Sequence, residues 1–506
     1  MAYLLFPLLF LLSTVPSDRI TANSQSQPTD EGFISAVISE KGLEFAKDLL
    51  IEKAVESLTP LRLPDIKKGM SFPLIGGVQV TASNVTLNGI SVSSSTVHPG
   101  DSGVVIVASG ANSSLSLDWS YSYGTWLIPI EISDKGSASI QVEGMEIGLT
   151  MSMKNQNGTL QLTVSECGCY MKDLVITLSG GASWFYQGFV NAFADVIRSA
   201  VENAITKKIT EGASKLDSLL QSLPKKINVD KTAALDVTFT KDPLYGNSSI
   251  EFDINGLFLS LNKDASFSHL HNHHQLSLSC GGASKMLLIS LDEAVFNSAA
   301  VVYFQAGMMH WIVDKVPDQS LLNTASWRFL IPQLYRKYPN DDMLLNISLT
   351  SSPLMKIRPE KIGGTIYADM LVIVLDGTEM VPVACISVVV TVSGVVEISG
   401  NNLAGKAELD DFSLNLKWSK VGNFHMSLIQ GVVRVFLNTV FVPYVNSHLS
   451  HGFPLPIVSG FTLQDAYLFT SNSRISVCSD VVFTNSSGVK NWKSKYSLNF
   501  VSDEQV

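Results

Sequence analysis

Hydrophobic residues recur every three or four positions along residues 183–223, with lysines and glutamates between them. This spacing places the apolar side chains on one face of an α-helix, and Pro224 ends the pattern. At about 1.5 Å per residue the helix would extend roughly 60 Å. A helix that is apolar along one whole side needs an elongated partner surface, and we expect that partner to be a twisted sheet.

The rest of the chain repeats one order of elements twice. Residues 33–58 carry a helical pattern, and residues 70–178 alternate apolar and polar positions with Gly, Asn and Ser between the runs, which is typical of antiparallel strands. In the second half, residues 291–313 and 424–449 have helical spacing, and the expected strands between them are 343–349, 361–373, 381–398 and 409–417. Two copies of helix, sheet and helix predict two related domains.

The predicted boundaries follow from changes in this pattern. Residues 3–12 are apolar, and about ten such residues are too few to span a bilayer, so they indicate the core of a signal peptide. The product is therefore expected to be secreted. The predicted segments are a signal peptide at 1–22, a first domain at 33–242, a linker with a central crossing at 243–284, a second domain at 285–485 and a polar tail at 486–506.

Composition narrows the class of partner. Only 16% of the residues are charged, and the formal net charge is −10. Nucleic acid is therefore not expected as a partner, because phosphate binding needs a basic surface. The chain also lacks a Gly-x-Ser-x-Gly elbow, a His-Glu-x-x-His pair and a phosphate loop, so we do not expect an enzyme.

Short motifs point to the compartment and argue against a metal. The Asn-x-Ser/Thr sequons, expected to carry N-glycans in a secreted chain, are Asn84, Asn112, Asn157, Asn247, Asn346 and Asn485. The five cysteines leave at least one thiol unpaired in a monomer, which is the expected state. Cys167 and Cys169 have no second close pair that would complete a zinc site, and the run of histidines at 269–274 is interpreted as a solvated loop.

Several short motifs resemble, in order and spacing, the family of bactericidal/permeability-increasing and lipopolysaccharide-binding proteins. The first is Ile38-Ser39-Glu40-Lys41-Gly42-Leu43-Glu44-Phe45-Ala46, followed by Leu63-Pro64-Asp65. The others are Val142-Glu143-Gly144-Met145, Tyr303-Phe304-Gln305-Ala306-Gly307, Gly452-Phe453-Pro454-Leu455-Pro456 and Asp480-Val481-Val482-Phe483. The low charge and the loops rich in Ser and Asn are most similar to the plant members.

The resemblance implies an α+β fold of two pseudo-symmetric domains arranged as a boomerang. Each domain would be a highly twisted antiparallel sheet or barrel wrapped on long amphipathic helices, joined to the other by a central sheet. Each would hold an acyl lipid, such as a phospholipid, beneath its helices, and no other cofactor is expected. Burying about 12 methylenes could contribute on the order of 10 kcal/mol. The pocket-lining candidates are Ile38, Phe45, Leu49, Phe189, Phe193, Ile197, Val302, Leu428, Val432 and Phe436.

The chain departs from the family where a lipid headgroup would bind. The bactericidal members carry a basic tip on the first domain, whereas no Lys or Arg occurs here from Gly69 through Asp134, a run of 66 residues. The remaining headgroup candidates are Arg62, Lys67, Lys68 and Lys135. Residues 119–126 are instead rich in Trp and Tyr, which suit either a lipid–water interface or half-buried strand positions. The family's disulfide to the long helix cannot form, because residues 183–223 contain no cysteine.

Three functions are consistent with these features. The first is a secreted glycoprotein that binds bacterial lipopolysaccharide in innate defence. The second is an extracellular phospholipid carrier or transfer protein without microbial recognition, and the third is a glycoprotein adaptor whose lipid is only structural. Contact with a membrane surface is compatible with the first two.

Overall fold

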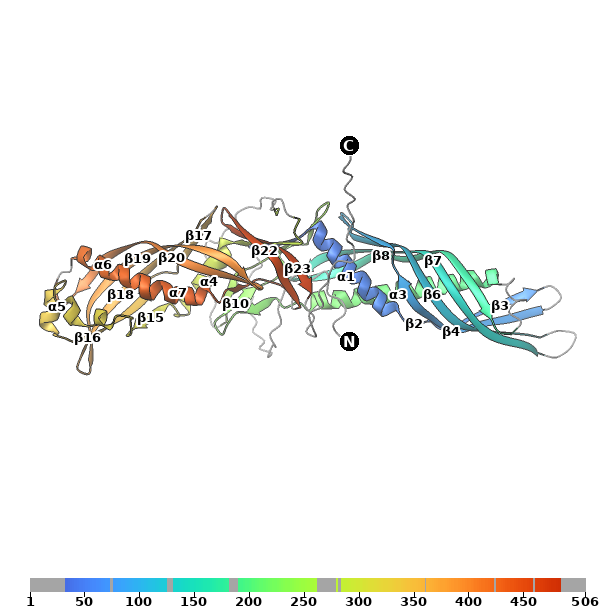
Figure 1. The fold of residues 1–506 in the computed structure, drawn as a ribbon, viewed down its shortest axis with the longest axis horizontal. Coiled ribbons are helices and arrows are strands. Elements are labelled where there is room, and N and C mark those ends of the chain that lie inside the picture. The colour runs from blue at the N-terminus through green and yellow to red at the C-terminus, as the bar shows by residue number, and fades with distance from the viewer. Residues whose placement is uncertain are drawn as a thin grey trace, which may run out of the picture.

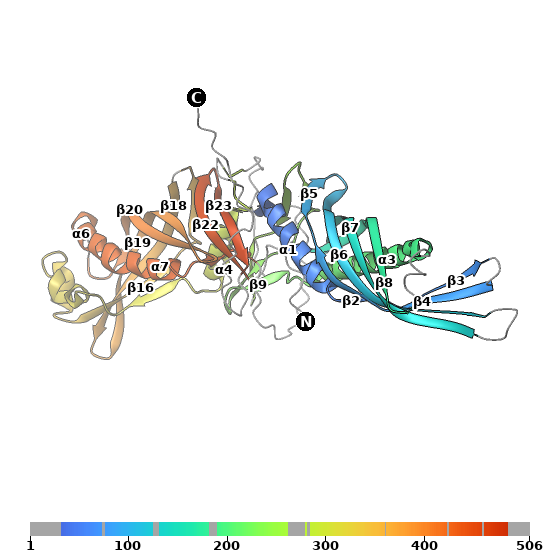
Figure 2. The same cartoon turned by 45° about the vertical axis from the view of Figure 1, so that its right-hand side comes forward.

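The structure is a computed structural model that describes residues 32–72, 76–124, 131–181, 190–261, 279–280, 284–359, 361–422, 425–457 and 460–483. Two elongated lobes extend from a central sheet to opposite ends of the molecule (Figures 1 and 2). Most of the described chain is in twisted antiparallel sheets, with few helices. The predicted α+β fold with two lobes is confirmed.

The elements are named in chain order. The first half contains β1 (Ile34–Ile38), α1 (Glu40–Leu58), β2 (Leu61–Arg62), β3 (Ile66–Phe72), β4 (Gly76–Ser91), β5 (Ser94–Gly100), β6 (Gly103–Gly124), β7 (Glu131–Gln156), β8 (Thr159–Ser179) and α3 (Val190–Gln221). The crossing contains β9 (Lys226–Asn228), β10 (Ala233–Asp236), β11 (Leu244–Tyr245), β12 (Ile250–Ile254) and β13 (Phe258–Ser260).

The second half follows the same kind of plan. It contains β14 (Leu287–Asp292), α4 (Glu293–Gln305), β15 (His310–Val313), η2 (Gln319–Leu322), η3 (Thr324–Trp327), α5 (Pro332–Lys337), β16 (Asp342–Leu349), β17 (Leu354–Arg358), β18 (Lys361–Asp376), β19 (Glu379–Ser399) and β20 (Asn402–Ser419). It ends with α6 (Met426–Phe436), η4 (Leu437–Phe441), α7 (Val442–Leu449), β21 (Phe453–Pro454), β22 (Phe461–Ser471) and β23 (Arg474–Phe483).

The N-terminal lobe is a seven-stranded sheet covered by α3. Its order is β2-β4-β6-β7-β8, with β3 paired to β4 and β5 paired to β6. Alternate residues of these strands, such as Leu115 and Leu117 of β6, are buried, so one face of the sheet carries the core. Ile197, Val201 and Ile205 of α3 are fully buried in the same core, as the helical spacing of residues 183–223 predicts.

The central sheet joins segments from the whole length of the chain. Its order is β11-β12-β1-β14-β23-β22, and β1 pairs with both β12 and β14. The helix predicted over residues 33–58 is therefore wrong at its start, because residues 34–38 form a strand. Helical spacing and alternation are hard to distinguish over five residues, and pairing with strands more than 200 residues away decides between them.

Two motif residues control the change from β1 to α1. The Ser39 hydroxyl caps the helix by accepting a hydrogen bond from the Gly42 amide, and it donates to the Lys285 carbonyl oxygen. Gly42 is needed because a Cβ there would clash with the carbonyl oxygen of Met286. The Ser39–Gly42 motif thus fixes α1 against the central sheet.

The predicted helix at residues 291–313 is also longer than the observed one. Asp292 ends β14 and caps α4, since its carboxylate accepts a hydrogen bond of 2.9 Å from the Ala294 amide. Gly307, with φ +71°, follows the end of α4, and residues 310–313 form strand β15. Only residues 293–305 of the predicted segment are helical.

Met426–Leu449, within the predicted segment 424–449, forms α6 and α7, which are joined without a break by the π turn η4. Among the described residues, Met426–Leu449 is the one helical segment whose length and composition would allow it to cross a membrane. Its inner side chains, including Ile429, Val433 and Phe436, lie in the core of the C-terminal lobe. Those contacts are the ones expected of an amphipathic helix that packs on a sheet.

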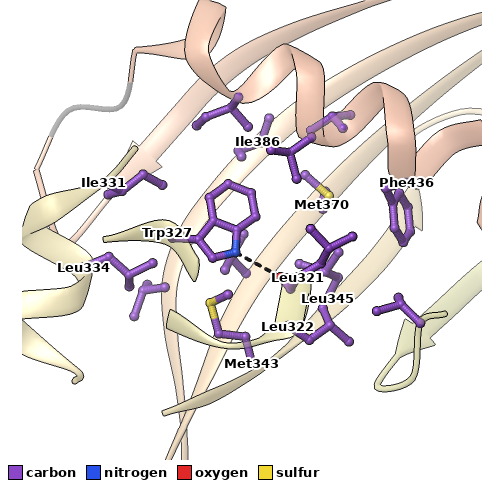
Figure 3. Close-up of a pocket in the computed structure, with 16 residues that line it drawn as sticks. Leu321, Leu322, Trp327, Ile331, Leu334, Met343, Leu345, Met370, Ile386 and Phe436 are labelled. Carbon is purple, nitrogen blue, oxygen red and sulfur yellow. Dashed lines mark hydrogen bonds between the residues drawn. The ribbon is translucent and has the colours of Figure 1, made fainter. Parts of the chain in front are cut away.

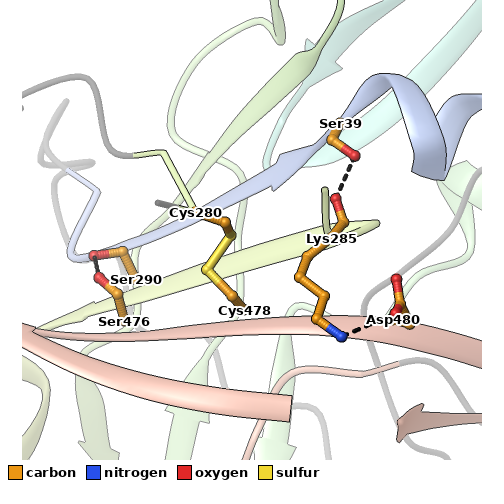
Figure 4. The surroundings of a disulfide bond; sticks show 7 residues. All are labelled: Ser39, Cys280, Lys285, Ser290, Ser476, Cys478 and Asp480. Carbon is orange, nitrogen blue, oxygen red and sulfur yellow. Dashed lines mark hydrogen bonds and ion pairs between the residues drawn. A yellow bond between two sulfur atoms is a disulfide. The ribbon is translucent and has the colours of Figure 1, made fainter. Parts of the chain in front are cut away.

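Covalent and ionic contacts hold the central sheet together (Figure 4). Cys280 forms a disulfide with Cys478 of β23, which joins positions 198 residues apart. Asp480 of β23 accepts hydrogen bonds from Lys41 Nζ at 2.7 Å and from Lys285 Nζ at 2.9 Å. Partial burial raises the pKa of the Asp480 carboxyl, but the two lysines outweigh this effect and leave the pKa below its ordinary value.

We expect the double variant Cys280→Ala/Cys478→Ala to lose about 2–5 kcal/mol of unfolding free energy, because the disulfide restricts the unfolded chain. Urea denaturation with and without a reducing agent measures the effect. The control is Cys167→Ala/Cys169→Ala, which removes two thiols that are free in the structure. A wild-type midpoint that does not move under reducing conditions would contradict the prediction.

Candidate functional site

An apolar pocket lies in the C-terminal lobe, between α6 and the concave face of the sheet (Figure 3). Its volume is about 60 Å³. The lining side chains are all hydrophobic: Val316, Leu321, Leu322, Trp327, Ile331, Leu334, Met343, Leu345, Met370, Val372, Val383, Ile386, Ile429, Val432, Val433 and Phe436. Such a surface offers dispersion contacts and no hydrogen bonds, so it suits an acyl chain.

The floor of the pocket follows from strand alternation. Met343 and Leu345 of β16 project to the same face because they are two residues apart, as do Met370 and Val372 of β18. The register places Leu345 opposite Val372 and Met370 opposite Ile386. Cross-strand neighbours therefore form a continuous apolar floor.

The far end of the pocket is closed by the segment from η2 to α5. Trp327, Ile331 and Leu334 point from this segment toward the cavity (Figure 3). The indole nitrogen of Trp327 donates a hydrogen bond of 2.9 Å to the Leu321 carbonyl oxygen, so its polar atom is satisfied within the wall. A fully apolar cavity of this kind excludes water.

Size limits what the pocket holds in this conformation. A volume of 60 Å³ is less than half that of a cavity of about 150 Å³ that holds one benzene molecule, and is far less than a full acyl chain needs. An acyl chain would therefore have to separate α6 from the sheet. The π turn η4 directly follows α6, and such turns insert an extra residue that interrupts the regular helical ladder.

The predicted pocket residues lie in different parts of the molecule, and only some of them line the pocket. Val432 and Phe436 line the pocket, whereas Leu428 lies on the outer face of α6 and is 51% exposed. Ile38 belongs to strand β1 and not to a helix, and Val302 of α4 is fully buried in the central core. Neither of these two residues lines the pocket, because β1 and α4 both pack in the central core.

The N-terminal candidates belong to two different cores. Phe45 and Leu49 of α1 are half-buried against the central core, while Phe193 and Ile197 of α3 belong to the core of the N-terminal lobe. Ile197 is fully buried, and Phe193 is half-buried. Phe189 lies outside the described residues.

Three of the headgroup candidates share the outer face of the N-terminal sheet. Strand register places Lys67, Thr81, Ser120 and Lys135 in one row across β3, β4, β6 and β7. The two lysines are therefore roughly 14 Å apart, three strand spacings of about 4.8 Å. Arg62 of β2 is exposed on the same outer face.

Lys68 lies on the inner face of the sheet. It pairs with Val80 on β4, and Val80 pairs with the buried Tyr121 on β6, so all three side chains project to the same side. The four candidates are thus spread over both faces of the sheet and form no compact basic cluster. The nearby aromatic residues are part of the core, because Trp119 and Tyr121 are 6% and 9% exposed. This supports strand positions over a lipid–water interface for these two side chains.

The sequons differ in accessibility. Asn84, Asn112, Asn157 and Asn247 are exposed, and Asn346 is half-buried on β16. Asn485 and the histidines of residues 269–274 lie outside the described residues. Within the described ranges, no three His, Cys, Asp or Glu side chains are grouped in a way that could hold a metal ion.

The free thiols near α3 are poorly reactive. Burial raises the pKa of Cys167 and, with the nearby Glu202 carboxylate, raises the pKa of Cys169 to about 12. Cys167 lies against the Thr206 carbonyl of α3, where no partner cysteine exists. No disulfide joins Cys167 to Cys169, and both remain thiols at neutral pH.

The closing wall of the pocket was missing from the sequence-based predictions. Its apolar residues, from Val316 to Leu334, recur at irregular spacings of one to five residues, and no continuous helix or strand explains them. The available signal was a dense apolar run that contains Trp327 and follows a predicted helix. Only the folded chain shows that this run lies across the open end of the sheet.

Both lobes match a known protein family. The model of the LBP / BPI / CETP family, N-terminal domain, matches residues 42–223, and the model of the C-terminal domain matches residues 227–483. A BPI/LBP family protein of Arabidopsis thaliana is 53% identical over 469 residues, covering 93% of this chain and 96% of the relative.

More distant relatives extend the match to animals. The bactericidal permeability-increasing protein of Sebastes schlegelii is 26% identical, covering 88% of this chain and 94% of that protein. Human lipopolysaccharide-binding protein is 24% identical, covering 88% of this chain and 92% of that protein. A crystal structure of lipopolysaccharide binding protein has the same fold, with a TM-score of 0.61 and 20% identity over 90% of this chain and 100% of that one.

Proposed function

Since the chain belongs to the LBP/BPI/CETP family of non-enzymatic lipid-binding proteins, we propose that it is a secreted glycoprotein that holds acyl chains in apolar pockets and binds bacterial lipopolysaccharide in innate defence. The observation that carries the lipid part is the pocket beneath α6, whose lining is entirely apolar. The lipopolysaccharide part is supported by the named activity of two animal relatives.

A phospholipid carrier is the competing function, and one observation favours it. The N-terminal sheet presents only scattered basic side chains, with Lys67 and Lys135 roughly 14 Å apart on its outer face. A phosphorylated glycolipid headgroup would meet few cations there. The acyl chains would therefore supply most of the binding free energy in either case.

The deciding experiment is purification from the native host, followed by mass spectrometry of the bound lipids. Exchange against labelled phospholipid and competition by purified lipopolysaccharide come next. Displacement by lipopolysaccharide supports the defence function, and exchange of phospholipid alone supports the carrier. A tight phospholipid that does not exchange supports an adaptor with structural lipid, and the absence of any acyl lipid would overturn the proposal.

Secretion and glycosylation give a separate prediction. Expression of the full chain in plant or animal cells should yield a protein in the medium whose gel mobility increases after treatment with an N-glycosidase. The quadruple variant of the exposed sequons, each Asn→Gln, should lose most of that shift; its positions are Asn84, Asn112, Asn157 and Asn247. Retention inside the cell with unchanged mobility would contradict this prediction.

A further inference from the structure

The distal end of the C-terminal lobe combines exposed cations with an exposed aromatic ring. This surface, which we call the distal tip, is formed by Arg328, Phe329, Arg336 and Lys337 around α5, at the end of the lobe in Figure 1. Phe329 is 79% exposed, and the guanidinium of Arg328 lies 4.5 Å from the centre of its ring. An apolar ring exposed to this extent beside cations is unusual for a surface that contacts only water.

The charge of the distal tip differs from that of the whole chain. Residues 319–340 contain three basic residues and no Asp or Glu, although the net charge of the protein is −10. Arg328, Arg336 and Lys337 form no ion pair with any described residue. Three acidic residues flank this segment. The Asp318 carboxylate accepts hydrogen bonds from Ser320, the Asp342 carboxylate accepts one from Asn323, and Asp341 is hydrogen-bonded to Thr324 through its backbone.

A neighbouring segment adds a fourth cation. Gly422 lies against Gln333 of α5, and just before it the exposed Lys420 has its Nζ 5.7 Å from the ring centre of Trp418. Trp418 is itself 40% exposed. Cations beside amphipathic aromatic rings are the composition expected at an anionic lipid interface.

The distal tip is continuous with the apolar pocket. Trp327, Ile331 and Leu334 point into the pocket, while Arg328, Phe329 and Arg336, from the same segment, are exposed. One short segment thus presents hydrophobic side chains inward and cations outward. A lipid that left a membrane at this position would meet the pocket wall directly.

From this juxtaposition we infer that the distal tip docks on an anionic phospholipid bilayer, with Phe329 inserted among the headgroups and the cations on lipid phosphates. This inference rests on the proposed acyl-lipid function and adds the surface through which lipid is acquired. It assigns that role to the C-terminal lobe and not to the N-terminal sheet, where the basic candidates are scattered.

Vesicle binding tests the inference. The full-length protein is sedimented with vesicles of phosphatidylcholine and with vesicles containing anionic phosphatidylglycerol. The variant Arg328→Gln/Arg336→Gln/Lys337→Gln should bind the anionic vesicles roughly 100-fold more weakly, since each basic residue near such a surface contributes about a tenfold factor or less. The matched control is Lys154→Gln/Lys225→Gln/Lys226→Gln, three exposed lysines from strands β7 and β9 and the turn before β9.

Single apolar changes separate insertion from charge. Phe329→Ser should weaken binding about tenfold, whereas Val395→Ser, at a 66% exposed position of β19, should not. Equal binding by the tip and control variants would overturn the inference. It would also be overturned if Leu428→Ser/Val435→Ser, on the outer face of α6, lost binding while the tip variants kept it.

A second measurement distinguishes failure of this inference from failure of the proposed function. Loading with a dispersed short-chain fluorescent phospholipid, without vesicles, reports the pocket alone. The tip variants should load like the wild type. If the wild type binds vesicles but does not load, the proposed function fails and the docking surface stands, and if it loads but does not bind anionic vesicles, the docking surface fails.

Discussion

Replacing Val432 with tryptophan is expected to prevent acyl lipid from occupying the C-terminal lobe. Val432 lines the pocket, and an indole ring in its place would fill a cavity of about 60 Å³. Overpacking of a tight apolar site costs about 1–3 kcal/mol, which corresponds to a roughly 5–150-fold loss of lipid affinity. The fold should persist, since a cost of this size is below the usual stability of a folded domain.

The measurement uses a phospholipid with a photoreactive acyl chain, followed by identification of the labelled peptides. Labelling of α6, β16 and β18 should disappear in Val432→Trp. Leu428→Trp is the matched control, because this position lies on the same helix with its side chain 51% exposed. Unchanged labelling in Val432→Trp would show that acyl chains do not enter this pocket.

Ile197→Asp should unfold the N-terminal lobe. Ile197 is 1% exposed within the core between α3 and the sheet, and the introduced carboxylate would have no cationic partner among the described core residues. Burying an unpaired charge and removing the apolar side chain together should cost on the order of 4–5 kcal/mol or more. Urea denaturation followed by circular dichroism measures the loss.

A graded series on α3 makes this prediction specific. Phe193→Asp should have a smaller effect because Phe193 is only half-buried, and Ser199→Asp should have almost none because Ser199 is exposed. Ser and Asp have similar helix propensities, so Ser199→Asp controls for charge alone. Equal midpoints for all three variants would show that the inner face of α3 is misassigned.

Periodicity in the sequence was sufficient for the long regular elements. The helix α3, the strands β16, β18, β19 and β20, and the helical stretch from α6 to α7 lie where the spacing of apolar residues predicts them, whereas β17 was not predicted. In such segments many residues report the same period, so a few exceptions do not change the interpretation. The resemblance then supplied the two-lobed arrangement that the repeated plan had already suggested.

The residues at which α1 and α4 begin are set by the pairing of strands that are distant in the sequence. Residues 34–38 and 287–292 are short apolar runs that fit either a helix or a strand by spacing alone. They are strands because each one satisfies its backbone groups against the other in the central sheet. That pairing joins segments about 250 residues apart in the chain, and a local pattern does not contain it.

At the candidate site, the sequence predicted the helix correctly, but only the structure shows which of its side chains are buried. Sequence analysis predicted that α6 is amphipathic, but it selected Leu428 as a pocket residue where the structure buries Ile429. One position along a helix turns a side chain by about 100°, which is enough to move it from the core to solvent. The contacts between α6 and the sheet decide which of two adjacent residues on the helix is buried.

The composition of the chain shows that it is apolar and weakly charged, and the positions of its Lys and Arg residues show that none lies between Gly69 and Asp134. Only the tertiary structure placed Trp327, Ile331 and Leu334 over the end of the pocket and left Arg328, Phe329 and Arg336 outside it. The physical reason is that a short irregular segment has no period of its own. The surface that it covers decides which of its side chains are buried, and in this protein that surface is the sheet of the C-terminal lobe.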